Sequence, residues 1–149
     1  MTEIAHQLSD RTAHGSVSVA RTGTRTYQGL NESGEIVLVG PAGTPGHFSP
    51  GELLKIALAA CAGMSSDRVI SRRLGDDYDT TIWVHGLADE SDRYSEVDEE
   101  MLLDTTGLSD EDRTALLAII QKSILASCTI ERTLSGPVTI HHSIDGTPR

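Results

Sequence analysis

The segment from Ser49 to Met64, SPGELLKIALAACAGM, constrains the fold of this chain more than any other. Ser49 fits a helix N-cap, Pro50 fits the first helical position, and Glu52 completes a capping box three residues after the cap. Leucine, isoleucine, alanine, cysteine and methionine then cover most of the helix circumference. Because a helix that is apolar all round is a buried one, we expect this helix to lie inside a core.

Two helices are predicted in all. The first is expected to end at Gly75, after two arginines that suit the negative end of the helix dipole. The second is predicted to begin at the N-cap Ser109, with Asp112 in a second capping box, and to end near Ala126. Cys128 follows at or just past that end.

Alternating apolar and polar residues predict strands around these helices. An N-terminal hairpin or meander is expected from 15–20 and 25–39, with the turn NESG inside the latter. Further strands are predicted within 78–89 and 137–144, and a possible one within 96–106. This order of strands and helices predicts an α+β chain.

Length and charge narrow the class of protein. A chain of 149 residues without a visible repeat or linker predicts a single domain, residues 1–149. The net charge of −10 argues against nucleic acid or an anionic membrane surface as a partner. The stretch MTEIAHQLSD shows no secretory signal, and no apolar run reaches the roughly 20 residues that span a bilayer. We therefore expect a cytoplasmic protein, whose two cysteines are reduced by default.

The two cysteines are the residues with the most evident chemistry. Cys61 lies about three turns into the first helix, and Cys128 lies just after the second. If the two helices pack together, the thiols could meet within the short distance that a disulfide requires. Considered singly, a free cysteine in an alanine-rich and leucine-rich helix is usually a small buried hydrophobe.

The two cysteine motifs resemble those of the OsmC/Ohr family, the osmotically induced and organic-hydroperoxide-resistance proteins. SPGELLKIALAACAGMSSD is similar to the first motif of that family, and SCTIERTL is similar to the second. The order of hairpin, long helix, strand, second helix and final strand also agrees, over roughly residues 14 to 144. The form SPGELL resembles the general OsmC-like branch more than the Ohr branch.

The resemblance implies a fold, an assembly and an activity. Members of this family are intertwined homodimers, in which two long central helices are packed between β-sheets and the active sites lie at the subunit interface. They are cysteine-based thiol peroxidases that reduce organic hydroperoxides, and hydrogen peroxide less well. No metal or bound cofactor takes part, and an external dithiol restores the enzyme.

The resemblance also assigns roles to particular residues. Cys61 is expected to attack the peroxide and become a sulfenic acid, and Cys128 to form a disulfide with it. An arginine of the N-terminal hairpin is expected to stabilise the thiolate, with Arg25 preferred and Arg21 as the alternative. Phe48 and Met64 are candidates to contact the alkyl part of the substrate.

The chain departs from the family pattern at two places. The family's glutamate commonly lies ten residues before the cysteine, where this chain has Gly51. Glu52 is the candidate for that function, although its capping box accounts for it equally well. The second cysteine is often followed by proline, where this chain has Thr129. Glu131 is expected to raise a thiol pKa if it lies close in space.

Two other interpretations compete with the peroxidase. His47, His141 and His142 could gather with the cysteines around a metal, but the sequence has no zinc-type spacing. Alternatively, the chain is a non-enzymatic protein of the same fold that binds a small apolar ligand or senses redox state. Serine hydrolysis has no support, because a GxSxG elbow is missing.

Overall fold

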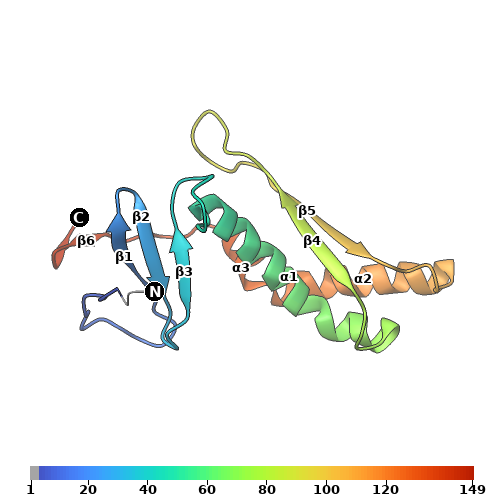
Figure 1. The fold of residues 1–149 in the computed structure, drawn as a ribbon. Helices are drawn as coiled ribbons and strands as arrows, with labels where there is room; N and C mark the ends of the chain where they lie inside the picture. The colour runs from blue at the N-terminus through green and yellow to red at the C-terminus, as the bar shows by residue number, and fades with distance from the viewer. Residues whose placement is uncertain (1–3) are drawn as a thin grey trace. The chain divides into compact units, whose positions relative to one another are not determined.

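A computed structural model describes residues 4–149 of the chain. Residues 1–3, which open the stretch MTEIAHQLSD, lie outside the described part. The chain divides into two compact units, one up to Leu54 and one from Lys55 to Arg149. Figure 1 shows the elements, which are β1 (Ser18–Gly23), β2 (Thr26–Leu30), β3 (Ile36–Val39), α1 (Pro50–Leu74), β4 (Thr80–His85), β5 (Asp98–Leu103), α2 (Asp110–Ser127), α3 (Thr129–Leu134), β6 (Ser143–Ile144) and β7 (Thr147–Pro148).

The first unit is built on an antiparallel sheet with the strand order β1-β2-β3. The turn between β2 and β3 is closed by Asn31, whose side-chain oxygen accepts hydrogen bonds from the N–H groups of Ser33 and Glu35 at 3.0 and 2.8 Å. Two strands around the NESG turn are therefore confirmed. The strand expected at 15–20 begins later, because pairing with β2 starts only at Ser18, opposite Leu30.

Helix α1 begins and ends at the residues that the sequence predicts. Glu52 accepts a hydrogen bond from the Ser49 N–H at 2.7 Å, and its own N–H donates to the Ser49 hydroxyl at 3.2 Å. This reciprocal pair is a complete capping box. At the other end Gly75 adopts a φ of 92°, the left-handed conformation in which glycine commonly stops a helix.

Helix α1 is buried along one stripe only, which corrects the expectation of burial all round. The buried residues Leu58, Ala62, Ser66 and Ile70 follow one another at intervals of four and so lie on one face. Met64 is 81% exposed and Ile56 is 46% exposed, because no element of the second unit covers their side of the helix. No helix within residues 4–149 has both the length and the hydropathy that a bilayer crossing requires.

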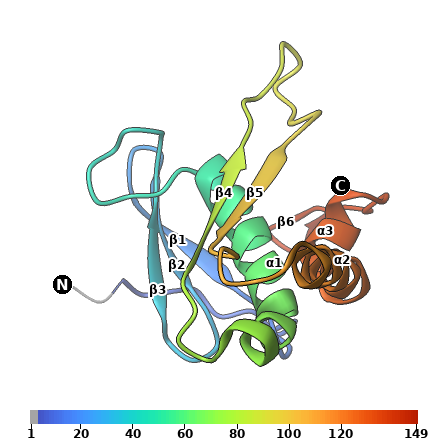
Figure 2. The same ribbon diagram turned by 90° about the vertical axis from the view of Figure 1, so that its right-hand side faces the viewer.

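The second unit places α1 against both the β4–β5 hairpin and α2 (Figures 1 and 2). Ile70 forms a buried cluster with Leu116 and Ile120 of α2. The side of β4 that carries Ile82 approaches α1 so closely that a Cβ added at Gly63 would lie 3.1 Å from the Ile82 side chain. A small residue at position 63 therefore lets the strand and the helix pack together.

Helix α2 agrees with its prediction, and α3 was not predicted. Ser109 is the N-cap of α2, its hydroxyl accepts from the Asp112 N–H at 3.1 Å, and Cys128 is the C-cap. The chain then continues directly into α3, with Cys128 as the N-cap. One residue therefore ends one helix and begins the next, and this geometry fixes the position of the Cys128 thiol.

The prediction of a strand over residues 137–144 is largely wrong. Only Ser143–Ile144 is a strand, and it pairs with Thr147–Pro148 in a short hairpin. Residues 137–142 are not paired with any described strand, and Val138 and Ile140 are exposed. Alternating apolar residues are not sufficient for a strand, because its N–H and C=O groups also need a partner strand.

Candidate active site

Cys61 of α1 and Cys128 between α2 and α3 are near enough for each thiol to shift the pKa of the other. Both are free thiols, and both belong to the second unit. Cys128 is completely buried, whereas Cys61 is partly exposed. The packing of α1 against α2 includes a hydrogen bond from the Ser123 hydroxyl to the Ser65 carbonyl, with 2.6 Å between the oxygens. Two thiols far apart in the sequence therefore share one site, and one of them can be reached from solvent.

The surroundings of Cys61 favour its thiolate. The largest effect on its pKa is a lowering by a hydrogen bond from the Ile130 backbone N–H, followed by a lowering by the Cys128 side chain. Burial raises the pKa, and the N–H of Thr129 and the side chain of Ser65 lower it further. The net pKa is lowered, because hydrogen-bond donors stabilise a thiolate. The first turn of α3 supplies two of these donors.

The surroundings of Cys128 favour its neutral thiol. Burial is the largest cause of its raised pKa, and interactions with Cys61 and the charge of Glu131 raise it further. The one opposing effect is the hydrogen bond from the Glu131 N–H to the Cys128 sulfur, at 3.4 Å. The expectation that Glu131 raises a thiol pKa therefore agrees with the structure.

A second carboxyl group belongs to the same neighbourhood. Glu99 lies in β5 opposite Val84, on the half-buried face that β4 turns toward α1. Burial raises the pKa of Glu99, and the charge of Glu131 raises it further. The negative charge of Glu131 thus acts on both Cys128 and Glu99.

The arginine candidates lie in the first unit. Arg21 lies in β1 opposite Tyr27, and Arg25 lies in the turn between β1 and β2 with a φ of 60°. This left-handed conformation is uncommon for a residue other than glycine and is typical of tight turns. The pairing of either guanidinium with Cys61 stays a prediction. Glu52, at the first turn of α1, makes the capping box described above.

Phe48 and Met64 both present apolar surface. Phe48 is 47% exposed and its N–H donates to the Leu38 carbonyl at 2.9 Å, which ties it to the edge of the first sheet. Met64 follows Cys61 by three residues on α1, and its side chain is almost fully exposed. Their predicted contact with a substrate is untested.

In the described part of the chain, the structure offers no cluster of side chains that supports the metal interpretation. Within residues 4–149, no three side chains of histidine, cysteine, aspartate or glutamate are gathered as metal ligands. His47 instead lies within hydrogen-bond distance of the Pro45 carbonyl, at 2.9 Å. His141 and His142 are exposed.

The sequence reasoning missed the groups with the greatest effect on the Cys61 pKa, because most of them are backbone groups. The N–H groups of Thr129 and Ile130 reach Cys61 only because α3 begins immediately after Cys128. The available signal was Cys-Thr-Ile-Glu, which has the spacing of a capping box with cysteine in the place of serine. Ser65, four residues after Cys61, could have been found from helical spacing.

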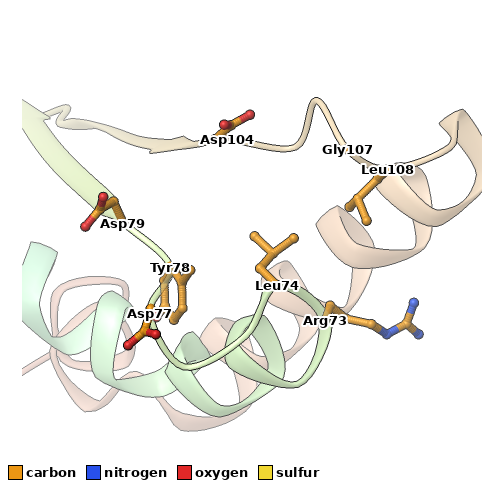
Figure 3. Close-up of a pocket in the computed structure, with 8 residues that line it drawn as sticks. All are labelled: Arg73, Leu74, Asp77, Tyr78, Asp79, Asp104, Gly107 and Leu108. Carbon is orange, nitrogen blue, oxygen red and sulfur yellow. The ribbon is translucent and has the colours of Figure 1, made fainter.

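A separate pocket lies at the C-terminal end of α1 (Figure 3). Leu74 and Tyr78 lie side by side in it, and the carboxylates of Asp77, Asp79 and Asp104 point away from them. Burial raises the pKa of Tyr78 to about 12, together with Asp67, which accepts a hydrogen bond from the Tyr78 hydroxyl at 2.6 Å. This tyrosine therefore stays protonated and fastens the loop after α1 to the helix.

Comparison with known proteins identifies the family and the fold. Residues 43–143, which include both cysteines, match the family described as OsmC-like protein. The chain belongs to the OsmC family. An uncharacterized protein of Mycobacterium tuberculosis is 48% identical over 124 residues, which cover 83% of this chain and 90% of that relative.

Solved structures show the same OsmC-like fold. An OsmC-like protein from Mycoplasma pneumoniae is similar with a TM-score of 0.63 and 14% identity, over 86% of this chain and 90% of the other. The organic hydroperoxide resistance protein OhrB of Bacillus subtilis is similar with a TM-score of 0.50 and 22% identity, over 85% of this chain and 95% of the other. At these identities the likeness establishes the fold, with its mixture of helices and sheets.

Proposed function

We propose that this OsmC-family protein is a thiol peroxidase that reduces organic hydroperoxides, and hydrogen peroxide less well, to alcohols or water. The proposal is carried by the placement of two free thiols in one neighbourhood, with surroundings that lower the pKa of the partly exposed Cys61 and raise the pKa of the buried Cys128. The thiolate is the nucleophilic form of cysteine, so these surroundings suit Cys61 for attack and Cys128 for resolution. We place this chemistry in the cytoplasm, where thiols are kept reduced.

The proposed cycle has three steps. The Cys61 thiolate attacks the distal oxygen of the hydroperoxide, the O–O bond breaks, and the alkoxide takes a proton and leaves as an alcohol. Cys61 is thereby oxidised to a sulfenic acid. The Cys128 sulfur then attacks the Cys61 sulfur, water leaves, and a disulfide forms. An external dithiol reduces that disulfide and restores both thiols.

The remaining site residues are assigned as follows in this proposal. Arg25, or Arg21 in its place, stabilises the Cys61 thiolate and the charge that develops on the leaving oxygen. Glu52 orients that arginine in addition to capping α1. Phe48 and Met64 contact the alkyl group of the substrate, which is consistent with their exposed apolar side chains.

We also propose that the protein acts as a homodimer. On α1, Ile56, Ala60 and Met64 form an exposed stripe with a spacing of four residues. Unpaired residues 137–142 carry the exposed side chains of Val138 and Ile140. A second copy would cover this apolar surface and supply a strand partner, which supports an assembly of two chains.

The test is stopped-flow oxidation of the reduced protein by cumene hydroperoxide and by hydrogen peroxide. Wild type, Cys61→Ser and Cys128→Ser are compared, with sulfenic acid trapping by dimedone as a second measurement. We expect Cys61→Ser to lose peroxide consumption and Cys128→Ser to accumulate sulfenic acid. Cumene hydroperoxide is expected to react faster than hydrogen peroxide with the wild type.

Two outcomes would contradict the proposal. Peroxide consumption at the wild-type rate by Cys61→Ser would remove Cys61 from the reaction. A single oxidation without turnover in excess dithiol would instead favour a redox sensor, since a sensor needs no catalytic cycle. Metal analysis of protein purified without a histidine tag tests the metal interpretation independently.

A further inference from the structure

The resolution step requires that the Cys128 thiol lose a proton in a place without solvent. Cys128 has no exposed surface, so bulk water does not reach its sulfur in this structure. A neutral thiol is a poor nucleophile, so a proton acceptor beside Cys128 would speed its attack. The question is which described group can take that proton.

The sequence Cys128-x-x-Glu131 is a capping box of which only half is made. At α1 the complete box uses the carboxylate of Glu52, which accepts from the Ser49 N–H. At α3 the Glu131 N–H donates to the Cys128 sulfur, but the Cys128 N–H donates to the Ile124 carbonyl at 2.8 Å, as the cap of α2. The return bond is therefore not made, and the carboxylate of Glu131 is not used for capping.

Glu131 is half-buried, its backbone N–H contacts the Cys128 sulfur, and the charge of its carboxylate acts on that thiol. Within residues 4–149, Glu131 makes no ion pair and its side chain makes no hydrogen bond. The titratable groups that interact with Cys128 and Glu131 from packed elements are Cys61 of α1 and Glu99 of β5. Neither of them is a cation that would compete for the carboxylate.

We propose that the carboxylate of Glu131 accepts the proton of the Cys128 thiol as Cys128 attacks the oxidised Cys61. The inference rests on the proposed function, and it names the proton acceptor of its second step. The Cys128 sulfur forms a bond to the Cys61 sulfur, the S–O bond of the sulfenic acid breaks, and Glu131 takes the thiol proton. The departing hydroxide regains that proton and leaves as water, so atoms, charge and electrons balance.

The charge of Glu131 also affects the rate of resolution, in the direction opposite to proton acceptance. Its negative charge disfavours the Cys128 thiolate, but this is the smallest of the causes that raise that pKa, and burial is the largest. Loss of the charge alone would make resolution slightly faster. Loss of a proton acceptor makes it slower, by about tenfold or more in typical general-base catalysis. The direction of the change therefore distinguishes the two effects.

The experiment starts from a mixed disulfide of Cys61, which can be formed without peroxide. The partly exposed Cys61 is converted to its mixed disulfide with thionitrobenzoate, and attack by Cys128 then releases the coloured thiolate. Wild type is compared with Glu131→Gln, with Glu131→Asp and with Glu99→Gln, which makes the same change of charge on β5. Cys128→Ser gives the background release.

We expect release near neutral pH to be at least about tenfold slower in Glu131→Gln, partly restored in Glu131→Asp and close to wild type in Glu99→Gln. The rate in Glu131→Gln should rise steadily with pH, because hydroxide replaces the lost acceptor, whereas the wild-type rate should be much flatter. Equal or faster release in Glu131→Gln overturns the inference. Because the assay contains no peroxide, failure of the peroxidase proposal appears separately, as a wild type that exchanges disulfides but leaves hydroperoxides unconsumed.

Discussion

Cys61 and Cys128 are the same chemical group in one neighbourhood, yet the protein shifts their pKa values in opposite directions. The pKa of Cys61 is lowered by the backbone N–H of Ile130, by the Cys128 side chain, by the N–H of Thr129 and by the Ser65 side chain, and these effects outweigh its burial. Cys128 receives one backbone hydrogen bond, and its burial outweighs it. The two pKa shifts differ because the sulfurs have different numbers of hydrogen-bond donors around them and are buried to different degrees.

The comparison shows that a short helix can assign different chemistry to two cysteines. Cys128 is the N-cap of α3, so its sulfur is held at the helix start by the Glu131 N–H. The preceding N–H groups, of Thr129 and Ile130, are thereby left for Cys61. Backbone donors have fixed directions and need no side-chain ordering, so they can favour one thiolate selectively.

The largest expected effect is a difference in alkylation rate between the two thiols. Near neutral pH we expect iodoacetamide to modify Cys61 about a hundredfold faster than Cys128, because each pKa unit changes the thiolate fraction tenfold and Cys128 is also buried. Peptide mass spectrometry over time measures both rates. In urea the two alkylation rates should become nearly equal. Equal rates in the native protein would contradict the opposite pKa shifts of the two thiols.

A smaller effect tests the burial of Tyr78, whose pKa burial also raises. The unfolded tyrosine loses its proton near pH 10, whereas the folded one holds it to about pH 12. The unfolded state therefore binds fewer protons between these values, and the free energy of unfolding falls as pH rises through them. We expect a loss of about 1 kcal/mol, measured by urea denaturation, which is absent in Tyr78→Phe. A wild type and variant with parallel pH dependence would contradict it.

Much of the fold was predictable from local signals. The capping box of α1, the N-cap Ser109, the Asn31 turn and Gly75 are short-range patterns that fix helix and turn boundaries, and all four appear in the structure as expected. In the second predicted box, Asp112 accepts a hydrogen bond from the Ser109 hydroxyl instead of the Ser109 N–H. The alternation in β4 also agrees, with Ile82 and Val84 half-buried and the intervening residues exposed. Local hydrogen bonding dominates at such positions, so sequence is sufficient there.

The features that the sequence did not predict depend on residues that lie far away in the chain. Residues 137–142 alternate like a strand but have no described strand beside them. Helix α3 was missed because cysteine is an unusual N-cap, and its effect on Cys61 depends on the packing of α1 against α2. In the candidate site, the side-chain types could be predicted, but the backbone donors around Cys61 could not.

Thr129→Pro tests one of the two backbone donors, the N–H group of residue 129. Proline suits this position, because Thr129 is the first residue of α3 and Cys128 before it is extended, with φ −73° and ψ 100°. The substitution removes the N–H that lowers the Cys61 pKa and leaves the Ile130 donor in place. We expect a higher Cys61 pKa and about threefold slower alkylation at neutral pH, with unchanged helix content by circular dichroism. Faster alkylation would show that backbone rigidity matters more than this donor.

The smallest effect is expected from Ser65→Ala, because the Ser65 side chain is the last of the causes that lower the Cys61 pKa. Its carbonyl, which accepts the Ser123 hydroxyl at 2.6 Å, remains, so the packing of α1 against α2 should be preserved. We expect the alkylation rate of Cys61 to fall by less than about twofold, since a neutral hydroxyl on a partly exposed thiolate competes with water. Ser123→Ala is the matched control, because it removes a hydroxyl from the same pair of helices without removing a donor to Cys61. A decrease larger than that of Thr129→Pro would mean that a side chain, and not the start of α3, chiefly stabilises the thiolate.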